Sequence, residues 1–366
     1  MSTRAREAGP RVVAVAPIPP PLQGAAATTA GILDYIRPHV ELRVANVSPG
    51  TATGLAYHLT RSWRNLKAMA LLVANSLAPG RVLYMTADGG LGAFYNIAVA
   101  GLGTLLGYRI FLHHHSFAYV DRHNARVATV ARIIHGNGVH VVLCEAMADG
   151  LRARYPIRET LELSSAALLP ARPRAALRSG GVLRMGFLSN LIIEKGLDTS
   201  IALLRAARSE GLPVELAIAG KPYNPGDTEP LELIDRAKAE LGDSVSYLGG
   251  LSEEAKNAFL QELDVFLFPS RYVNEAQPRA VLEALANGVP VLTVARSCIT
   301  SDMGSGTGAC VPRDADFVAQ ALPLIRQWAT DRGALTTDSQ AAQERGEALH
   351  ANGLCHLATL VEAFRS

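Results

Sequence analysis

Two glutamates eight positions apart, Glu275 and Glu283, are the side chains of this sequence best placed to bind a polar substrate. They lie in the segment FLFPSRYVNEAQPRAVLEALANGVPVLT, residues 266–293. Glu283 is flanked by aliphatic side chains, and a carboxylate in an apolar setting usually has a binding or catalytic role. The pair predicts two carboxylates that accept hydrogen bonds from sugar hydroxyls on either side of a phosphate group. The competing interpretation is a solvated glutamate on a helix surface.

The elements around the two glutamates predict the phosphate site itself. A buried strand ends at Pro269, a loop follows, and a helix begins near Pro278 and ends at Gly288. The first N–H groups of such a helix have no acceptor within the helix and favour a bound anion. In an open α/β sheet, ligands bind beyond the carboxyl ends of the strands, where these groups would lie.

Five segments in order resemble the retaining GT-B glycosyltransferases of family 4. The two glutamates followed by EALANGVPV are similar to the family pattern E-G-x-G-x-x-x-x-E-A-x-A-x-G-x-P-V. Four further segments match the family in the same order, at residues 186–204, 216–222, 245–270 and 303–314. One pair of glutamates is a weak signal, whereas five ordered segments are a specific one.

The resemblance implies a role for each matching residue. Glu283 would bind the ribose hydroxyls of a nucleotide, and Glu275 would bind hydroxyls of the donor sugar. Lys195, in the E-K-G segment, would neutralise the leaving diphosphate, because a fixed cation stabilises negative charge as it develops. A surface lysine beside a turn glycine is the alternative for Lys195. The backbone amides that would face the diphosphate or the sugar are those of Ala276, Gln277 and Arg279.

This sequence departs from the family pattern in two places. Asn190 stands where the family commonly has an arginine that binds the phosphates together with Lys195, and an amide brings no charge. Lys221 and Arg271 are candidate substitutes for that arginine. Residues 276–278 are Ala-Gln-Pro in place of Gly-x-Gly, which reshapes the sugar pocket, so the sequence does not predict the sugar.

Two segments of the N-terminal half also resemble the family. Gly24 lies in a loop where the family has a glycine-rich turn, and it is predicted to let the backbone approach the donor phosphates; a plain surface loop is the alternative. Three consecutive histidines end a predicted strand at residues 113–115, and the resemblance implies that His114 or His115 lies near the donor sugar. Packing histidines are the competing interpretation. Adjacent strand residues point to opposite faces, which disfavours a metal site.

Alternating strands and helices predict the fold that positions these residues. Strands are expected at 11–17, 41–47, 81–86, 108–113 and 140–145, and again at 182–189, 214–220, 245–250, 264–270 and 290–295. Such alternation predicts mostly parallel sheets covered by helices on both faces. We therefore expect an α/β protein of GT-B type, with two Rossmann-like domains facing across a donor-binding cleft.

The domain bounds follow from a linker candidate rich in proline, arginine and glycine at residues 164–181. The acceptor-side domain is predicted over residues 1–178 and the nucleotide-sugar domain over 179–345. A terminal helix over 346–366 is expected to return to the first domain by analogy with the fold class. The apolar stretch 93–112 is interrupted at Gly107, which favours a buried helix followed by a buried strand over a membrane span.

Charge is distributed unevenly along the chain. Residues 1–178 carry 19 Arg and Lys against 9 Asp and Glu, whereas the remainder carries 16 against 24. The basic half predicts an anionic partner, either a phosphorylated acceptor or the surface of a membrane. A membrane surface or lipid-phosphate acceptor is compatible with the basic residues Arg61, Arg64, Lys67, Arg122, Arg126 and Arg132, and a soluble sugar or small molecule is the alternative. Scattered solvated arginines are the alternative, and nucleic acid is not expected. The four cysteines form no C-x-x-C pair and no signal segment is recognised, so the expected location is the cytoplasm, with peripheral contact at the inner membrane face as an open alternative.

The predicted reaction is hexosyl transfer with retention at the anomeric carbon. A nucleoside-diphosphate sugar, UDP- or GDP-linked, would be the donor, and a hydroxyl of a glycan, a lipid-linked sugar or a small molecule would be the acceptor. No metal and no separate cofactor are expected, because enzymes of the resembled fold generally need no bound metal and the sequence shows no D-x-D motif of the metal-dependent type. Two alternatives remain: a nucleotide-sugar epimerase of the same fold, and a non-catalytic GT-B binding partner.

Overall fold

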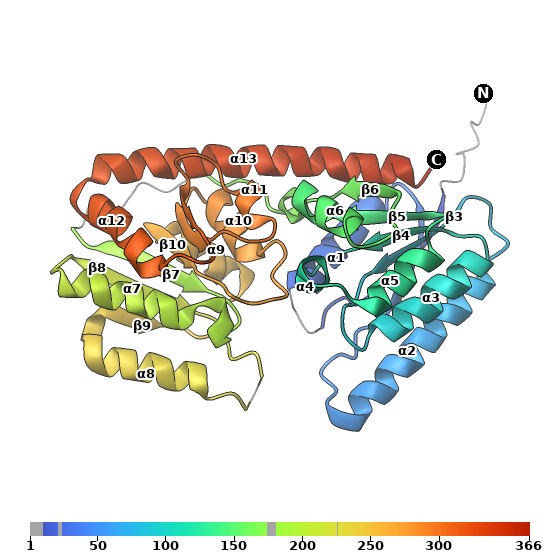
Figure 1. The fold of residues 1–366 in the computed structure, drawn as a ribbon, viewed down its shortest axis with the longest axis horizontal. Coiled ribbons are helices and arrows are strands. Elements are labelled where there is room, and N and C mark those ends of the chain that lie inside the picture. The colour runs from blue at the N-terminus through green and yellow to red at the C-terminus, as the bar shows by residue number, and fades with distance from the viewer. Residues whose placement is uncertain (1–9, 21–23, 174–180, 225) are drawn as a thin grey trace. The chain divides into compact units, whose positions relative to one another are not determined.

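The computed structural model describes residues 10–20, 24–173, 181–224 and 226–366 (Figure 1). The chain divides into two compact units. Unit 1 comprises Met1–Leu168 together with Ala351–Ser366, and unit 2 comprises Leu169–His350. The predicted boundary at residue 178 lies outside the described residues.

Unit 1 contains a six-stranded sheet in the order β2-β1-β3-β4-β5-β6. Every neighbouring pair of strands is parallel, which confirms the parallel sheet expected from alternation. The strands are β1 Arg11–Ala16, β2 Glu41–Asn46, β3 Arg81–Thr86, β4 Arg109–His113, β5 Gly138–Val142 and β6 Glu159–Glu162. The helices are α1 Gly24–Ile36, α2 Gly54–Ala74, α3 Ala93–Leu105, α4 Ala118–Asp121, α5 Ala125–Ile133 and α6 Glu145–Arg152, followed by the 3-10 helix η1 Ser165–Leu168.

Unit 2 repeats this plan with the strand order β12-β11-β10-β7-β8-β9, again all parallel. The strands are β7 Leu183–Leu188, β8 Val214–Ala219, β9 Val245–Tyr247, β10 Val265–Phe268, β11 Val291–Val294 and β12 Gly308–Val311. The helices are α7 Leu197–Ser209, α8 Glu229–Leu241, α9 Glu253–Gln261, α10 Arg279–Ala286, α11 Ile299–Asp302, α12 Phe317–Thr330 and α13 Arg332–Ala363, with the 3-10 helices η2 Ile193–Lys195 and η3 Gly242–Ser244.

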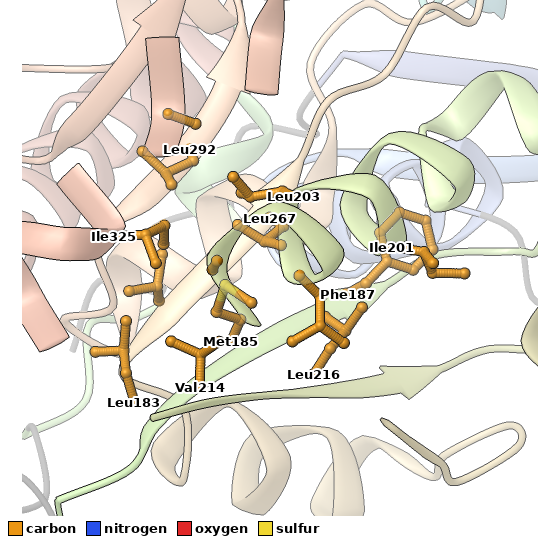
Figure 2. Close-up of a cluster of buried hydrophobic side chains, with 14 of the residues drawn as sticks. Leu183, Met185, Phe187, Ile201, Leu203, Val214, Leu216, Leu267, Leu292 and Ile325 are labelled. Atoms are coloured by element: carbon orange, nitrogen blue, oxygen red, sulfur yellow. The ribbon is translucent and has the colours of Figure 1, made fainter. Parts of the chain in front are cut away.

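Alternate residues of β7 build the core of unit 2. Leu183, Met185 and Phe187 point to one face of the sheet and are fully buried (Figure 2). They pack in the same cluster as Val214 of β8 and Ile201 of α7, so that the helix is held over the sheet by apolar contact. This packing fixes the carboxyl end of β7, where the residues expected to bind phosphate begin.

The last residues of the chain complete the core of unit 1. Leu357, Leu360 and Phe364 are buried in the cluster that also holds Val12 of β1. The ring of Phe364 lies 4.7 Å from that of Phe111 in β4, edge on. The terminal segment of α13 therefore forms part of unit 1 although α13 begins in unit 2.

Three expectations about elements need correction. The segment predicted as a buried helix, α3, leaves Phe94 and Leu105 exposed on its outer side. The predicted linker at 164–181 begins with the buried turn η1, and its residues 174–180 lie outside the described residues. Strands β6 and β12 were not predicted, because their sequences ETLE and GACV are polar or glycine-containing edge segments. Among the described residues, no helix is long and apolar enough to cross a membrane.

Candidate functional site

The two predicted carboxylates lie at the carboxyl end of β10 and in the following helix. Glu275, in the loop between β10 and α10, is 7% exposed, and Glu283, within α10, is 6% exposed. Two carboxylates this deeply buried need cationic or hydrogen-bonding partners, because burial of an unpaired charge is strongly unfavourable. The solvated-glutamate interpretation is therefore wrong for both.

Glu275 is paired with Lys195. The ammonium Nζ of Lys195 lies 2.5 Å from Oε2 of Glu275 and also 4.8 Å from the centre of the Tyr272 ring. Ser270 Oγ donates a weaker hydrogen bond of 3.4 Å to the same carboxylate oxygen. The predicted sugar-binding carboxylate and the predicted phosphate-binding cation thus meet at one point, although 80 residues separate them in sequence.

The close approach of Lys195 to the end of β10 requires the glycine that follows it. Gly196 has φ of 93°, a conformation that side chains with a Cβ rarely adopt. A Cβ at this position would lie 2.4 Å from the carbonyl oxygen of Pro269. The E-K-G motif is thereby explained physically: glycine lets the turn that carries Lys195 pack against the Glu275 loop.

The Glu275 loop is held from β11 by a turn that the sequence did not reveal. Ser297 has φ of 50°, and its Oγ donates a 2.7 Å hydrogen bond to the carbonyl oxygen of Glu275. The backbone N–H of Cys298 donates to the carbonyl oxygen of Ala276 at 3.0 Å. A non-glycine residue in the left-handed region is uncommon, and such residues concentrate at functional sites. The role of Ser297 was not predicted, because a serine after a strand is typical of an ordinary turn and belongs to no motif here.

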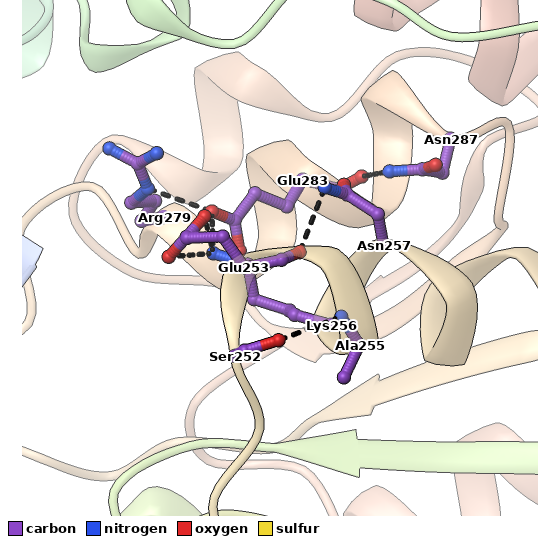
Figure 3. A network of polar contacts seen from close by, with 8 residues as sticks. All are labelled: Ser252, Glu253, Ala255, Lys256, Asn257, Arg279, Glu283 and Asn287. Atoms are coloured by element: carbon purple, nitrogen blue, oxygen red, sulfur yellow. Dashed lines mark hydrogen bonds and ion pairs between the residues drawn. The ribbon is translucent and has the colours of Figure 1, made fainter.

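Glu283 lies between two cations (Figure 3). Lys256 Nζ is 2.6 Å from Oε1 of Glu283, and Nε of Arg279 is 2.7 Å from the same oxygen. Lys256 belongs to α9, whose predicted N-cap Ser252 is confirmed by its hydrogen bond from the N–H of Ala255. Arg279 was expected to contribute its backbone amide, and its side chain adds this ion pair. Lys256 was missed, since a lysine on a surface-type helix carries no signal of its own.

The predicted backbone amides belong to the start of α10, with Pro278 as the residue before its first turn. Ala276 and Gln277 are buried, and the side-chain amide of Gln277 donates to Asp302 at 2.9 Å. Their contribution to a diphosphate site, with that of Arg279, remains a prediction.

The cations proposed to replace the missing family arginine differ in their surroundings. Asn190 is exposed directly after β7. Arg271 is held by the carboxylate of Asp198, at 2.9 Å and 3.1 Å, and donates to the hydroxyl of Thr199. Lys221 is exposed after β8. Arg271 is thus committed to a pair of its own, which leaves Lys221 as the better candidate.

The three histidines at the end of β4, of which His113 is its last residue, alternate between the two faces of the sheet. The rings of His113 and His115 are tilted against each other at 44° with centres 4.0 Å apart, and His113 Nδ1 shares a 2.6 Å hydrogen bond with the hydroxyl of Tyr84. His114 points elsewhere: its two ring nitrogens lie 3.1 Å from the hydroxyl of Tyr119 and 2.9 Å from Nδ1 of His140.

These surroundings keep the histidines neutral. Burial lowers the pKa of His115 and His140 to about 4 and, helped by the neighbouring histidines, lowers the pKa of His113 and His114 well below 6.5. Both nitrogens of His114 are engaged, whereas Nε2 of His115 has no hydrogen-bond partner among the described residues. His115 is therefore the better of the two predicted sugar-binding histidines, and His114 fits the packing interpretation.

Two other predictions concern unit 1 and metals. Gly24 is the exposed first residue of α1, and residues 21–23 of its loop lie outside the described residues. Across the described residues, no group of three or more His, Cys, Asp or Glu side chains has a geometry that could hold a metal ion.

Comparison with known proteins finds a family match within unit 2. Residues 174–334 match the family model described as glycosyl transferases group 1. Over 148 residues, 39% of this chain, the chain is 29% identical to the amylovoran biosynthesis glycosyltransferase AmsK of Erwinia amylovora. Over 138 residues, 36% of this chain, it is 33% identical to the GDP-mannose:cellobiosyl-diphosphopolyprenol alpha-mannosyltransferase of Xanthomonas oryzae pv. oryzae. The matched segments span 35% of the length of each of these relatives.

Solved structures extend the likeness to both units at the level of fold. The Anabaena protein Alr3699/HepE in complex with UDP-glucose has a TM-score of 0.71 at 13% identity, covering 96% of this chain and 99% of its own. A sucrose-phosphate synthase from Thermosynechococcus elongatus has a TM-score of 0.72 at 16% identity, covering 97% and 98%. The two Rossmann-like sheets of the chain are thus those of a GT-B fold. The family match thus covers residues 174–334, and the likeness over both units is one of fold.

Proposed function

We propose that the protein is a retaining glycosyltransferase of family 4 that moves a hexosyl group from a nucleoside-diphosphate sugar to a hydroxyl acceptor. The observation that carries the proposal is the convergence of Glu275, Lys195 and Glu283 around the start of α10, with each buried carboxylate paired to a cation. The named relatives are glycosyltransferases, which favours transfer over the epimerase alternative.

Each residue has a distinct task in this proposal. Glu283 accepts hydrogen bonds from ribose hydroxyls, and Glu275 accepts hydrogen bonds from the donor sugar and so orients its anomeric carbon. Lys195, close to both the Glu275 carboxylate and the start of α10, neutralises the charge that grows on the diphosphate as the glycosidic bond breaks. The leaving phosphate then assists the acceptor hydroxyl on the same face, so no protein nucleophile is needed and the configuration is retained. His115, neutral, donates or accepts one hydrogen bond at the sugar.

The relatives and neighbours support the proposed donor and acceptor classes. UDP-glucose is bound in the Anabaena structure, and one relative uses GDP-mannose by name, so UDP- and GDP-sugars are the first donors to test. The relatives named for amylovoran biosynthesis and for a diphosphopolyprenol substrate favour an acceptor that is a growing glycan or a lipid-linked sugar.

The test is nucleotide release from a panel of UDP-, GDP- and ADP-sugars. We expect release from one nucleotide class, loss of release in Glu275→Ala, and unchanged release in Glu240→Ala, which removes an exposed carboxylate of α8 that pairs with Arg205. In parallel, calorimetric titration with the free nucleotide should show about tenfold or greater weakening in Glu283→Gln, because two charge-assisted hydrogen bonds to the ribose are lost. Full release by a well-folded Glu275→Ala would refute the proposal.

A further inference from the structure

Helix α2 has an outward apolar face that no other described element covers. Leu55, Leu59, Trp63, Leu66 and Val73, here called the α2 stripe, are between 53% and 74% exposed. They recur at intervals of three, four and seven residues, which places them along one side of a helix with 3.6 residues per turn. Single exposed apolar side chains are ordinary, but five on one helix face form an apolar surface.

The α2 stripe lies opposite the side of the helix that packs into unit 1. Asn65, Ala68 and Leu72 are the buried residues of α2, and Ala68 and Leu72 belong to the core cluster of the sheet. The helix therefore has two apolar sides, of which only one is used by the fold. The stripe residues are not needed to hold α2 in place.

The neighbouring helix extends this surface. Phe94 and Leu105 of α3 are 56% and 83% exposed. A 2.7 Å hydrogen bond between Ser62 of α2 and the hydroxyl of Tyr95 fixes the two helices to each other. The outward sides of α2 and α3 thus form one apolar area on unit 1.

Charge around this area is mostly positive, with Asp88, which pairs with Arg61 at 2.6 Å, as an acidic neighbour. Helices α2, α3 and α5 contain no aspartate or glutamate, and α3 packs on α5. Lys67 Nζ lies 5.1 Å from the centre of the Trp63 ring, and the guanidinium of Arg126 lies 4.8 Å from that of Phe94. The basic side chains of the three helices are Arg61, Arg64, Lys67, Arg126 and Arg132.

We propose that the outward faces of α2 and α3 dock on an anionic phospholipid surface. Such a surface offers an apolar interior for the α2 stripe and Phe94, and negative headgroups for the cations beside them. Tryptophan next to lysine suits this boundary, since the indole lies at the headgroup level and the lysine reaches outward to phosphate. A second copy of the chain fits poorly, because a two-fold contact would bring the same cations face to face.

The test is co-sedimentation of the full chain with vesicles of phosphatidylcholine alone and of phosphatidylcholine mixed with phosphatidylglycerol. We expect binding to the mixed vesicles, weakened by added salt, and little binding to phosphatidylcholine alone. The double variant Leu59→Ser with Trp63→Ser should bind about tenfold or more weakly, since both side chains lose apolar burial. Lys67→Glu should also weaken binding. The matched control Val182→Ser, at a 47% exposed position of unit 2, should bind like the unchanged protein.

The outcomes separate this proposal from its alternatives. Equal binding to both vesicle types, or unchanged binding by a double variant with normal thermal unfolding, would overturn the assignment. So would sedimentation velocity showing a dimer that the double variant abolishes, because that result assigns the surface to a second copy. Nucleotide release from donor without acceptor is measured in the same samples. Release that persists in the double variant shows that the membrane surface and the proposed transfer chemistry are independent.

Discussion

At the scale of single residues, the Lys195–Glu275 pair is the feature with the sharpest consequence. Lys195→Met removes the cation next to the proposed diphosphate while retaining the length and apolar stem of the side chain. We expect kcat for nucleotide release to fall by about 10²–10³, the effect typical of losing one charge-stabilising group in an active site. The control is Lys238→Met in α8, a lysine that also lies near a tyrosine ring, at 5.8 Å, but remote from the two glutamates in sequence and sheet position. Similar losses in both variants would argue against a specific role for Lys195.

A second prediction at this scale concerns Gly196, and it distinguishes the effect of backbone strain from the effect of a steric clash. Gly196→Ala should destabilise the protein by about 1–3 kcal/mol and lower activity, because the new Cβ must push the Lys195 turn away from Pro269. Gly211 also has positive φ, 76°, but a Cβ there meets no atom within 4 Å. Gly211→Ala should therefore cost stability without affecting activity. Urea unfolding and nucleotide release on both variants measure the two effects, and equal activities would contradict the steric argument.

The sequence predicted the residues of this site better than their partners. Glu275, Glu283 and Lys195 belong to a pattern with fixed spacing, so their types and order identify them. Lys256 and Ser297 contribute through contacts that form only when distant elements pack: α9 against α10, and the turn after β11 against the Glu275 loop. A single sequence does not encode such contacts as a local motif.

At the scale of elements, the histidines at the end of β4 predict a pH-dependent stability. His113, His114, His115 and His140 are neutral in the folded protein because burial lowers the pKa of each. In the unfolded chain the histidine pKa is about 6.5. As pH falls below about 6.5, the unfolded state binds protons that the folded state does not, so stability is present above this pH and is lost toward pH 4.

The size of this effect can be measured by variants of the cluster. Each histidine should contribute up to about 1.4 kcal/mol of lost stability per pH unit in that window. The free energy of unfolding, followed by urea titration from neutral pH down to about pH 5, should fall less steeply in His140→Gln than in the unchanged protein. His39→Gln, at an exposed position before β2, is the control and should leave the slope unchanged. Identical slopes for all three proteins would show that the cluster does not govern acid stability.

Most strands were predictable because a β-branched run bounded by turn residues is a local signal. The incorrect predictions concern segments whose local sequence does not indicate their position in the tertiary structure. β6 and β12 are edge strands that need little apolar sequence, since only one side of each is paired. The outward face of α3 was predicted as buried because its apolar composition alone does not tell a core-facing side from the exposed one with Phe94 and Leu105.

At the scale of the whole molecule, the division into two units has an energetic consequence. Removal of Ala351–Ser366 should unfold unit 1 and leave unit 2 folded, because the core of unit 1 loses Leu357, Leu360, Val361 and Phe364. Burial of such side chains stabilises by about 1.5–3 kcal/mol each, which together rivals the total stability of a domain, about 5–15 kcal/mol. Differential scanning calorimetry of the shortened protein should lack the unfolding transition of unit 1 and retain that of unit 2.

Point variants test the same idea without shortening α13. Phe364→Ala, which removes the ring packed on Phe111, should lower the unfolding midpoint of unit 1 by an amount equivalent to about 3–5 kcal/mol. Leu354→Ser, at a 40% exposed position of the same helix, should have little effect. Equal midpoints for the two variants would mean that the terminal segment is dispensable to unit 1.

Unit 1 is built from two segments that lie before and after unit 2 in the sequence, and this affects the order of folding during translation. The ribosome synthesises Met1–Leu168 before unit 2, whereas the side chains that close the core of unit 1 follow unit 2 in the sequence. Unit 2, which is continuous in sequence, has all of its residues available earlier. Nascent chains stalled before Leu357 should accordingly expose the first unit to protease while the second already resists, reversing the usual order in which domains mature during translation.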